Sequence, residues 1–532
     1  MWTQGWRDQV WSQLDREFVI IIVGGGITGA GILREAARAG LKAILFEAGD
    51  FASGTSSRSS KLVHGGLRYL RNAQIKLTYE SVHERERLLD EGRGLVAPLP
   101  FLMANFRRDK IPAWVFGIGL SLYDIMALKW NHAAYTPDGL RSLCPQLTSS
   151  DMVGGYRYFD AQTDDARLVL RVILEATQDG ALALNYARVE GLLKTKGQVC
   201  GVSVRDLAPG SGKTAEVRAR VVVNAAGAWA DELRGQIGGP KRLRVLRGSH
   251  LFFPWSKLPL ARAVTFLHPE DGRPVFIFPW EGVTLVGTTD VDHRAAPTTD
   301  LCISGEEAEY LMAAVMHAFP GLGLTLADVQ STLAGVRAVV DTGRENPSKA
   351  SREFVLWNEA GLLTVTGGKL TTFRVMAQKA LRAVRPLLPE HPRLGREARV
   401  LNPLPDEAKV CGEAAPALRL RLVGRYGDEV CNLVEAARNG ELDPIGSTPT
   451  LWAELRWAAR AEGVVHLDDL LLRRVRLGII LSGGGLKEMA RICAIVQPEL
   501  GWGEERWKQE VEAYRQTWQQ YYNICDKPSM KI

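Results

Sequence analysis

The chain has no long apolar segment, although 46% of its 532 residues are hydrophobic. The best candidate, residues 113–128, is interrupted by Asp124 and falls short of the roughly 18–20 apolar residues that span a bilayer. We therefore expect no membrane-spanning helix. The polar segment of residues 1–17 lacks the positive, then apolar, then small pattern of a signal peptide, so we expect no export.

Cysteines are few, and no two of them form a CxxC pair. The seven lie at positions 144, 200, 302, 411, 431, 493 and 525. Zinc sites need closely spaced ligands, and an odd, dispersed set of cysteines predicts reduced thiols in a cytosolic compartment. A calcium-loop pattern is also missing near the C-terminus. We expect no metal site.

Basic residues are not concentrated at the C-terminal end of the chain. The net charge is +6, but residues 411–532 contain 16 Lys and Arg against 17 Asp and Glu. This distribution argues against a nucleic-acid-binding module on the C-terminal part. The overall positive charge instead suits a small anionic substrate or an anionic surface.

The most informative segment begins with an apolar run at residues 18–23, which passes directly into a glycine-rich turn and a helix-compatible segment. In such a unit Gly24 permits the tight turn, and Gly26 lets a pyrophosphate approach the backbone. Gly29 allows close helix packing, and Glu47, at the end of the next apolar run, can accept hydrogen bonds from ribose hydroxyls. The pyrophosphate would lie at the helix N-terminus, where free N–H groups favour an anion. The spacing predicts a dinucleotide-binding unit.

The loop after this unit, residues 51–70, is dense in hydroxyls, glycines and cations. Such a loop can wrap a second phosphate and a flat ring. The residues expected to contact the cofactor from this loop are Thr55, Ser56, Ser57, Lys61, His64, Gly65 and Gly66. For His64 the residue type leaves two interpretations open, contact with the ring or simple packing.

Residues 53–70, SGTSSRSSKLVHGGLRYL, resemble the signature of the FAD-dependent glycerol-3-phosphate dehydrogenases. Further blocks resemble this family in the same order along the chain: FDAQTDDARL at 159–168, NAAGAWAD at 224–231, RGSH at 247–250, FIFPW at 276–280, GTTD at 287–290, GVR at 335–337, SR at 351–352 and GGKLTT at 367–372. The chain departs from the family pattern at Ala338, Arg247 and Val475, where proline, lysine and threonine are common. None of these changes removes a group that the chemistry needs.

The resemblance implies FAD as cofactor and the oxidation of sn-glycerol 3-phosphate to dihydroxyacetone phosphate by hydride transfer to flavin N5. The implied substrate-binding residues are Arg68, Tyr69, His250, Arg337 and Arg352. The implied catalytic residues are His250, Arg337 and Lys369. Further cofactor contacts are implied at Gly227, Gly368, Lys369, Leu370 and Thr371.

The chemical types of these residues suit such roles. Arginine binds phosphate through two parallel hydrogen bonds, and histidine can accept a proton near neutral pH. His250 is therefore the candidate base, with simple hydrogen bonding to its neighbours as the alternative. Lys369 follows two glycines at a predicted helix start, where its charge would offset an anion on the reduced ring. The alternative for Lys369 is a helix cap with a solvated side chain.

The fold class that the resemblance implies is α/β. We expect a Rossmann-like FAD-binding domain of the D-amino-acid-oxidase/glutathione-reductase-like class with an inserted antiparallel-sheet substrate domain. The FAD-binding domain would occupy residues 1–395, interrupted at about 100–150 and 240–335 by the substrate domain. After a proline-rich linker, residues 396–532 favour helix formers and predict a C-terminal helical domain.

Enzymes of this resemblance pass electrons to a quinone in the membrane, which implies peripheral attachment to the inner face of the cytoplasmic membrane. The basic amphipathic segment 370–388 is the first candidate for that contact, and residues 113–126 are the second. Two alternative functions stay open: an oxidase that uses oxygen and releases hydrogen peroxide, and a related FAD-dependent amine or hydroxy-acid oxidoreductase. A homodimer is a possible assembly.

Overall fold

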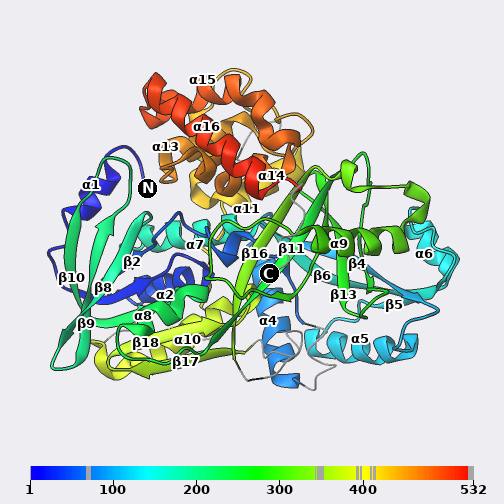
Figure 1. The fold of residues 1–532 in the computed structure, drawn as a ribbon, viewed down its shortest axis with the longest axis horizontal. Helices are drawn as coiled ribbons and strands as arrows, with labels where there is room; N and C mark the ends of the chain where they lie inside the picture. The colour runs from blue at the N-terminus through cyan, green and yellow to red at the C-terminus, as the bar shows by residue number, and fades with distance from the viewer. Residues whose placement is uncertain are drawn as a thin grey trace.

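A computed structural model describes residues 2–66, 74–341, 343, 353–390, 395, 398–407, 410 and 415–524. Arg68, Tyr69 and Arg352, three of the predicted substrate contacts, lie outside these ranges. Figure 1 shows two sheets side by side, with the C-terminal helices, coloured orange to red, above their junction.

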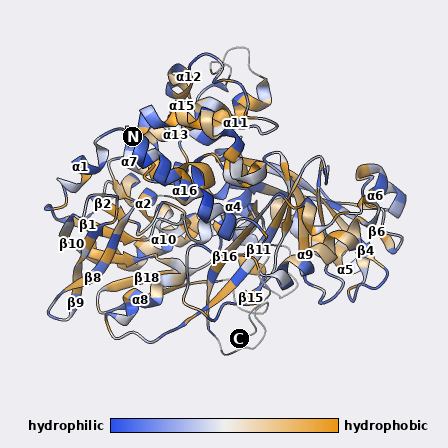
Figure 2. Cartoon of the chain, turned by 45° about the horizontal axis from the view of Figure 1, so that its top comes forward, coloured by the Kyte–Doolittle hydropathy of each residue, from blue (hydrophilic) through white to orange (hydrophobic). Residues whose placement is uncertain are grey.

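The first sheet is parallel at its centre, in the order β18, β10, β1, β2 and β7, and the antiparallel strand β17 pairs with β18. Two further strands, β8 and β9, extend from β10 as an antiparallel ribbon. The strands are β1 (Phe18–Val23), β2 (Ala43–Phe46), β7 (Leu182–Leu184), β8 (Ala187–Thr195), β9 (Gln198–Asp206), β10 (Thr214–Asn224), β17 (Phe354–Glu359) and β18 (Leu362–Gly367). Orange is frequent in the strands of this sheet in Figure 2, and the central strands β1, β2 and β18 are almost entirely buried and largely apolar because the sheet is covered on both faces there.

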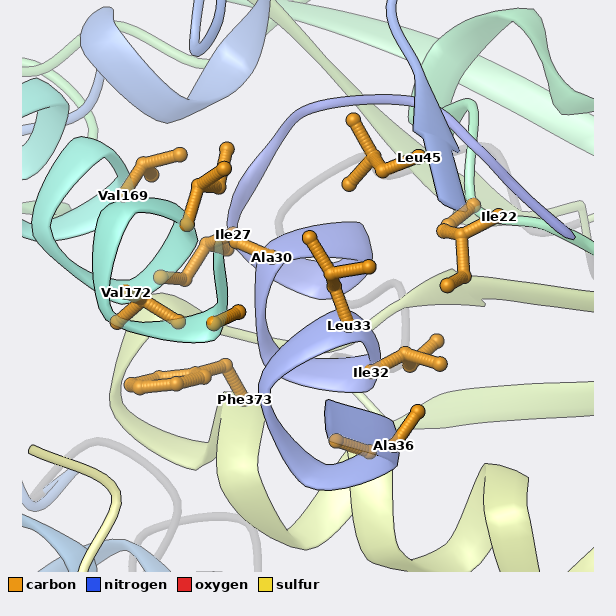
Figure 3. Close-up of a cluster of buried hydrophobic side chains, with 14 of the residues drawn as sticks. Ile22, Ile27, Ala30, Ile32, Leu33, Ala36, Leu45, Val169, Val172 and Phe373 are labelled. Carbon is orange, nitrogen blue, oxygen red and sulfur yellow. The ribbon is translucent and has the colours of Figure 1, made fainter. Parts of the chain in front are cut away.

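Helix α2 (Ile27–Arg38) lies at the centre of the layer that covers this sheet. It packs against β1 and β2 on one side and against α7 (Asp165–Gln178) and α10 (Phe373–Val384) on the others. Figure 3 shows Ile32 and Leu33 of α2 between the strands and the neighbouring helices, with Phe373 of α10 beside them. The dinucleotide unit is thereby fixed by a buried core on all sides.

The second sheet is largely antiparallel, and within the described residues only β12 and β4 pair in parallel. It contains β3 (Leu62–Val63), β4 (Val96–Phe106), β5 (Ala133–Tyr135), β6 (Met152–Thr163), β11 (Leu243–Pro254), β12 (Ala263–Leu267), β13 (Pro274–Trp280), β14 (Val283–Gly287), β15 (Val291–Asp292) and β16 (Ser331–Val340). Along β11 the side chains alternate: Leu251 and Phe253 join the core under α9 (Gly305–Ala318), whereas Phe252 joins the core shared with the C-terminal helices. Helix α6 (Pro137–Leu143) also lies over the α9 side.

Two helices, α4 (Ile75–Glu91) and α5 (Ala113–Ala127), pack together beside the two sheets. In its described residues, the C-terminal part consists of helices joined by loops. It contains α11 (Pro416–Tyr426), α12 (Val430–Ala436), α13 (Trp452–Ala461), a π-helical turn (Asp469–Arg474), α14 (Leu477–Ile480), α15 (Met489–Leu500) and α16 (Glu504–Tyr521). The predicted α/β class, with a Rossmann-like sheet, an antiparallel second sheet and C-terminal helices, is confirmed.

The structure also bears on the expectations about membrane-spanning helices and cysteines. Within the described residues, no helix is both long and apolar enough to cross a membrane. Cys144, Cys200, Cys431 and Cys493 are free thiols, whereas Cys302 is disulfide-bonded. The expectation of reduced cysteines is therefore wrong for Cys302.

Candidate active site

The glycine turn joins the end of β1 to the start of α2, and its glycines have different reasons to be glycine. Gly24 has a φ of 114°, and a Cβ there would lie 2.5 Å from the Ala225 carbonyl oxygen. A Cβ on Gly29 would lie 1.9 Å from the Gly24 carbonyl oxygen. Gly26 has extended backbone at the helix N-cap, where a Cβ would meet the Ser56 hydroxyl at 3.0 Å. Gly24 and Gly29 therefore serve packing, whereas Gly26 keeps the space in front of the helix free.

Glu47 follows β2 and organises this turn. Its Oε2 accepts a hydrogen bond from the Gly25 N–H at 2.6 Å, and its Oε1 accepts one from the Gly49 N–H at 2.9 Å. Burial raises the pKa of the Glu47 carboxyl. Glu47 therefore holds the glycine turn as well as facing the space where a ribose would lie.

A cleft of about 770 Å³ begins at the glycine turn, and this size is within the range of ligand and cofactor sites. Its lining includes nine of the predicted cofactor residues: Gly24, Gly26, Glu47, Thr55, Ser56, Gly227, Gly368, Lys369 and Leu370. Arg337 also lines it. The cleft thus connects the nucleotide-type turn to residues from β16 and from the start of α10. An elongated dinucleotide with a reactive ring at its far end fits such a site.

Other predicted cofactor residues do not line this cleft. They are Gly29, Ser57, Lys61, His64, Gly65, Gly66 and Thr371. Lys61 is fully buried, and its Nζ donates to both oxygens of Asp165 at 2.9 Å and to the Ser57 carbonyl at 2.8 Å. Because these contacts use its donors, the Lys61 ammonium is committed inside the protein and is not free to bind a phosphate.

A buried network of polar side chains holds the loop around Gly65 in place. The Gly65 N–H donates to Asp160 Oδ1 at 3.1 Å, and Tyr123 of α5 and Arg85 of α4 donate to the same oxygen. A Cβ on Gly65 would lie 2.2 Å from the Tyr123 hydroxyl, so glycine is required here for packing. The His64 carbonyl accepts a hydrogen bond from Thr371 Oγ1 at 3.2 Å, which ties this loop to the segment that carries Lys369.

Lys369 stands between two glycines and the short helical turn that leads into α10. Gly367 and Gly368 have φ values of 76° and 79°, a region that glycine adopts most readily, so the chain turns sharply into the cleft. The Lys369 ammonium donates to Ser81 Oγ at 3.0 Å. The side chain is therefore tethered by α4 while it lines the cleft, and it is not simply solvated.

His250 and Arg337 lie on the same face of the β11/β16 pair. His250 is paired with Leu333, Arg337 is paired with Leu246, and the positions differ by even numbers along both strands. His250 is 2% exposed, and its Nε2 lies 2.9 Å from Ser60 Oγ in the cofactor loop. Burial, aided by the Lys61 charge, lowers the pKa of His250 to about 3. The imidazole is therefore neutral at physiological pH.

Arg337 reaches the cleft from β16 and is held by a buried acid. Its Nη2 donates to Asp290 Oδ1 at 2.7 Å. The Arg337 side chain remains 28% exposed while Asp290 is buried, so the aspartate fixes the guanidinium at the edge of the cleft. An arginine fixed in this way places its charge at the edge of the cleft, where it can attract an anion.

Sequence reasoning missed the residues that hold these groups. Ser60, Ser81 and Asp290 are the partners of His250, Lys369 and Arg337. Trp229 also lines the cleft, and its indole N–H donates to the Pro297 carbonyl at 2.9 Å. Asp290 and Trp229 lie within blocks already singled out by resemblance, but nothing in the spacing assigns them a role. Arg68, Tyr69 and Arg352 are not placed by the described residues.

The fold and the cleft define a flavin-dependent oxidoreductase. Residues 20–374 match the family described as FAD dependent oxidoreductase, and residues 404–507 match the C-terminal domain of alpha-glycerophosphate oxidase. A glycerol-3-phosphate dehydrogenase of Bacillus halodurans, solved with FAD, superimposes with a TM-score of 0.78 at 27% identity, and the match covers 100% of both chains. FAD is therefore the cofactor, as predicted.

Curated relatives narrow this class. Glycerol-3-phosphate dehydrogenase 2 of Mycobacterium tuberculosis (strain ATCC 25618 / H37Rv) is 35% identical over 96% of this chain and 91% of its own. Aerobic glycerol-3-phosphate dehydrogenase of Bacillus subtilis (strain 168) is 37% identical over 72% of this chain and 70% of its own. The chain belongs to the family of FAD-dependent glycerol-3-phosphate dehydrogenases. The family predicted from the sequence is confirmed.

Proposed function

We propose that this protein oxidises sn-glycerol 3-phosphate to dihydroxyacetone phosphate and passes the electrons to a membrane quinone. The observation that carries the proposal is a single cleft that joins the glycine turn to Arg337 and Lys369. When bound, FAD supplies the hydride acceptor at flavin N5. The chain supplies the cation for the phosphate, the group that takes the hydroxyl proton and the charge that stabilises the reduced ring. Oxygen is the alternative electron acceptor and would use the same groups of the protein.

In this proposal Arg337 recognises the phosphate group of the substrate. Asp290 orients the guanidinium at the edge of the cleft, and its charge and planar shape suit the two negative charges of the phosphate. The expected Arg352 and Arg68 contacts would add to the same pocket. Lys369, tethered to Ser81, would lie near the pyrimidine edge of the flavin and offset the charge that this edge gains.

Replacing Arg337 by lysine is expected to raise the KM for glycerol 3-phosphate by about 10-fold or more. Lysine keeps the charge but loses the fork, and a charged hydrogen bond contributes roughly 1.5–3 kcal/mol. Steady-state kinetics with glycerol 3-phosphate measures the change. The same assay with glycerol provides the control, because wild type is expected to oxidise glycerol poorly. Equal efficiency of wild type with the two substrates would contradict the phosphate pocket.

His250 takes the hydroxyl proton in this proposal, from its neutral form. A buried imidazole with a pKa of about 3 is always ready to accept, but it holds a proton weakly. Ser60 Oγ holds the ring through Nε2, and the tautomer decides which ring nitrogen is left to accept the hydroxyl proton. His250 is therefore unprotonated and able to accept a proton, although a pKa this low makes it a weak base.

The lowered pKa of His250 also predicts a pH dependence of stability. The unfolded chain binds a proton at His250 below about pH 6.5, whereas the folded chain binds it only near pH 3. When the pH falls from about 7 to 5, the free energy of unfolding of wild type should therefore decrease by about 2 kcal/mol more than that of His250→Asn. Urea unfolding of both proteins at the two pH values measures this difference. An equal loss in both proteins would show that His250 is not buried neutral.

The first candidate for membrane contact, residues 370–388, is wrong. Phe373, Met376 and Leu381 of α10 are buried in the core of the first sheet, next to α2. Arg374 is buried and pairs with Glu84 of α4. The periodic pattern of apolar and basic residues arises because α10 covers a sheet, so the apolar face of this helix is packed in the core and is not available to lipid.

The second candidate, α5, does present apolar side chains to solvent. Trp114, Ile118, Leu122 and Ile125 are 64%, 54%, 46% and 59% exposed, and their spacing places them on one helix face. The exposed cations Arg107, Arg108, Lys110 and Lys129 flank this stripe at its two ends. An apolar stripe between cations fits the surface of an anionic bilayer. We propose α5 as the contact through which the enzyme reaches quinone.

Changing Ile118 and Ile125 together to glutamate is expected to weaken binding to anionic vesicles by about 10-fold or more. Each isoleucine contributes roughly 1.5–3 kcal/mol when fully buried, and the added charges repel the surface. Vesicle sedimentation measures binding, and wild-type binding should fall as salt rises. The matched control changes Leu207 and Leu442, two exposed leucines elsewhere, to glutamate. Equal loss in both variants would contradict α5 as the contact.

A further inference from the structure

The C-terminal helices reach the cofactor loop through three buried arginines of one short segment. Arg473 and Arg474 end the π-helical turn, and Arg476 follows in the left-handed conformation at a φ of 62°. All three guanidinium groups are almost fully buried. Besides contacts within their own domain, such as those of Arg473 with Asp468 and Asp469, they reach residues 50–57, of which residues 53–56 line the cofactor cleft. We refer to Arg473, Arg474 and Arg476 as the arginine clamp.

Two members of the arginine clamp hold Asp50. Arg474 donates two hydrogen bonds to the carboxylate of Asp50, at 2.6 and 2.8 Å, and Arg473 donates one at 2.5 Å. Asn185 donates a fourth at 3.0 Å. Burial raises the pKa of Asp50, but the charges of Arg474 and Arg473 outweigh it and hold this pKa well below its usual range. Asp50 is thus an ionised acid, completely enclosed, three residues after Glu47.

The third member of the arginine clamp holds the other end of the same loop. Arg476 donates to the Ser57 carbonyl at 2.9 Å and to Asp165 Oδ1 at 3.1 Å. Ser57 directly follows Thr55 and Ser56, which line the cleft, and Ser56 Oγ accepts a hydrogen bond from the Ile27 N–H at the start of α2. One turn of the C-terminal domain therefore fixes both ends of the loop that lines the cleft between Glu47 and Ser56.

The loop itself makes the contacts that shape the glycine turn. The Ala52 N–H donates to the Gly25 carbonyl at 3.1 Å, and Glu47 accepts from the Gly25 N–H. A shift of this loop would therefore move the ribose acceptor and the phosphate cradle together. Because Asp50 and its arginine partners are buried, water cannot replace a lost contact, and the loop has one well-defined position.

We propose that the arginine clamp is a positioning device through which the C-terminal domain sets the affinity of the protein for FAD. Arg473, Arg474 and Arg476 do not line the cleft; they hold Asp50 and Ser57 so that Glu47, Thr55 and Ser56 are already placed when FAD binds. The inference rests on FAD as the cofactor and is independent of the substrate and the electron acceptor.

The first test measures the binding of FAD to the apoprotein of Arg474→Lys, with quenching of the flavin fluorescence as the readout. Lysine keeps the charge but not the fork, so the Kd for FAD should rise by about 10-fold or more. At saturating FAD, the KM for glycerol 3-phosphate should stay at the wild-type value. The matched control is Arg456→Lys, since Arg456 is equally buried and forms the same two-pronged contact with Glu441 inside the C-terminal domain.

Each outcome of this test decides something. A raised Kd in Arg474→Lys with an unchanged Kd in Arg456→Lys supports the clamp. If both variants lose thermal stability and both keep the wild-type Kd, Arg474 has only a structural role and the proposal is overturned. Failure of the wild-type apoprotein to bind FAD would refute the cofactor assignment instead.

A second measurement uses the wild type alone, so it stands even if the variants do not fold. Coupling between two sites is reciprocal, so FAD must strengthen the arginine clamp if the clamp strengthens FAD binding. Hydrogen exchange of the apoprotein and the FAD-bound protein is compared at amides 469–476 and, as a control, in α16. Slower exchange at 469–476 but not in α16 is expected on FAD addition. Unchanged exchange at 469–476, with slower exchange at the glycine turn, would overturn the proposal.

Discussion

Replacing Gly26 by valine is expected to give a folded protein without FAD. The backbone at Gly26 is extended, with φ of −80° and ψ of −177°, a conformation that valine can adopt. Its branched side chain would point toward the Ser56 hydroxyl and fill the space in front of the first turn of α2. That space belongs to the pyrophosphate, which would lose two or more charged hydrogen bonds of roughly 1.5–3 kcal/mol each. FAD affinity should fall by about 10²-fold or more.

The measurement is the flavin absorbance of the purified variant together with the FAD Kd of its apoprotein. Gly503→Val is a close control, because Gly503 is also an extended N-cap, at the start of α16, with nothing near its Cβ position. This control should remain yellow. Gly24 and Gly29 are less useful targets, since a Cβ at either position would collide with backbone and disturb the fold itself. A yellow, FAD-replete Gly26→Val protein would contradict the position assigned to the pyrophosphate.

Replacing His250 by asparagine is expected to slow the reduction of FAD by glycerol 3-phosphate by about 10²-fold or more. General-base assistance is typically of this size, and asparagine cannot accept the proton. Asparagine can still form a hydrogen bond with Ser60, and His250 is not part of the glycine turn, so FAD should stay bound. Anaerobic stopped-flow mixing with glycerol 3-phosphate measures the rate of flavin reduction.

The control for this variant is His268→Asn. His268 is also buried in the second sheet, but it bonds to the Tyr310 carbonyl and stacks on the Tyr310 ring. Its replacement should leave the rate of flavin reduction near the wild-type value. Wild-type reduction by His250→Asn would remove His250 from the chemistry and restore the alternative in which it only hydrogen-bonds its neighbours.

Much of the fold could be predicted because it depends on sequence patterns within short segments. The apolar run before Gly24, the glycine spacing and Glu47 specify a strand, a turn, a helix and an acid within 30 residues. The structure has them as β1, α2 and β2 in a parallel sheet. The resemblance supplied the second sheet and the distant cofactor residues, such as Gly227 and Gly368, which no local pattern connects to the glycine turn.

The rest depended on contacts between residues far apart in the chain. Lys61 was predicted to contact the cofactor because of its place in a polar loop. Its ammonium group instead forms a buried ion pair with Asp165. The amphipathic pattern of α10 fits a membrane surface and a sheet-covering helix equally well, and only packing against α2 decides between them. The pairing of Arg474 with Asp50 joins residues 424 positions apart, which sequence spacing cannot predict.

The most direct test of the proposed function is anaerobic mixing of the FAD-loaded protein with glycerol 3-phosphate, followed by reoxidation. Glycerol 3-phosphate should bleach the oxidised flavin spectrum and yield dihydroxyacetone phosphate, while glycerol should not. A soluble quinone should then restore the spectrum much faster than oxygen does. Fast reoxidation by oxygen with release of hydrogen peroxide would contradict the quinone acceptor and support an oxidase. A flavin that glycerol 3-phosphate leaves oxidised would contradict the proposed function as a whole.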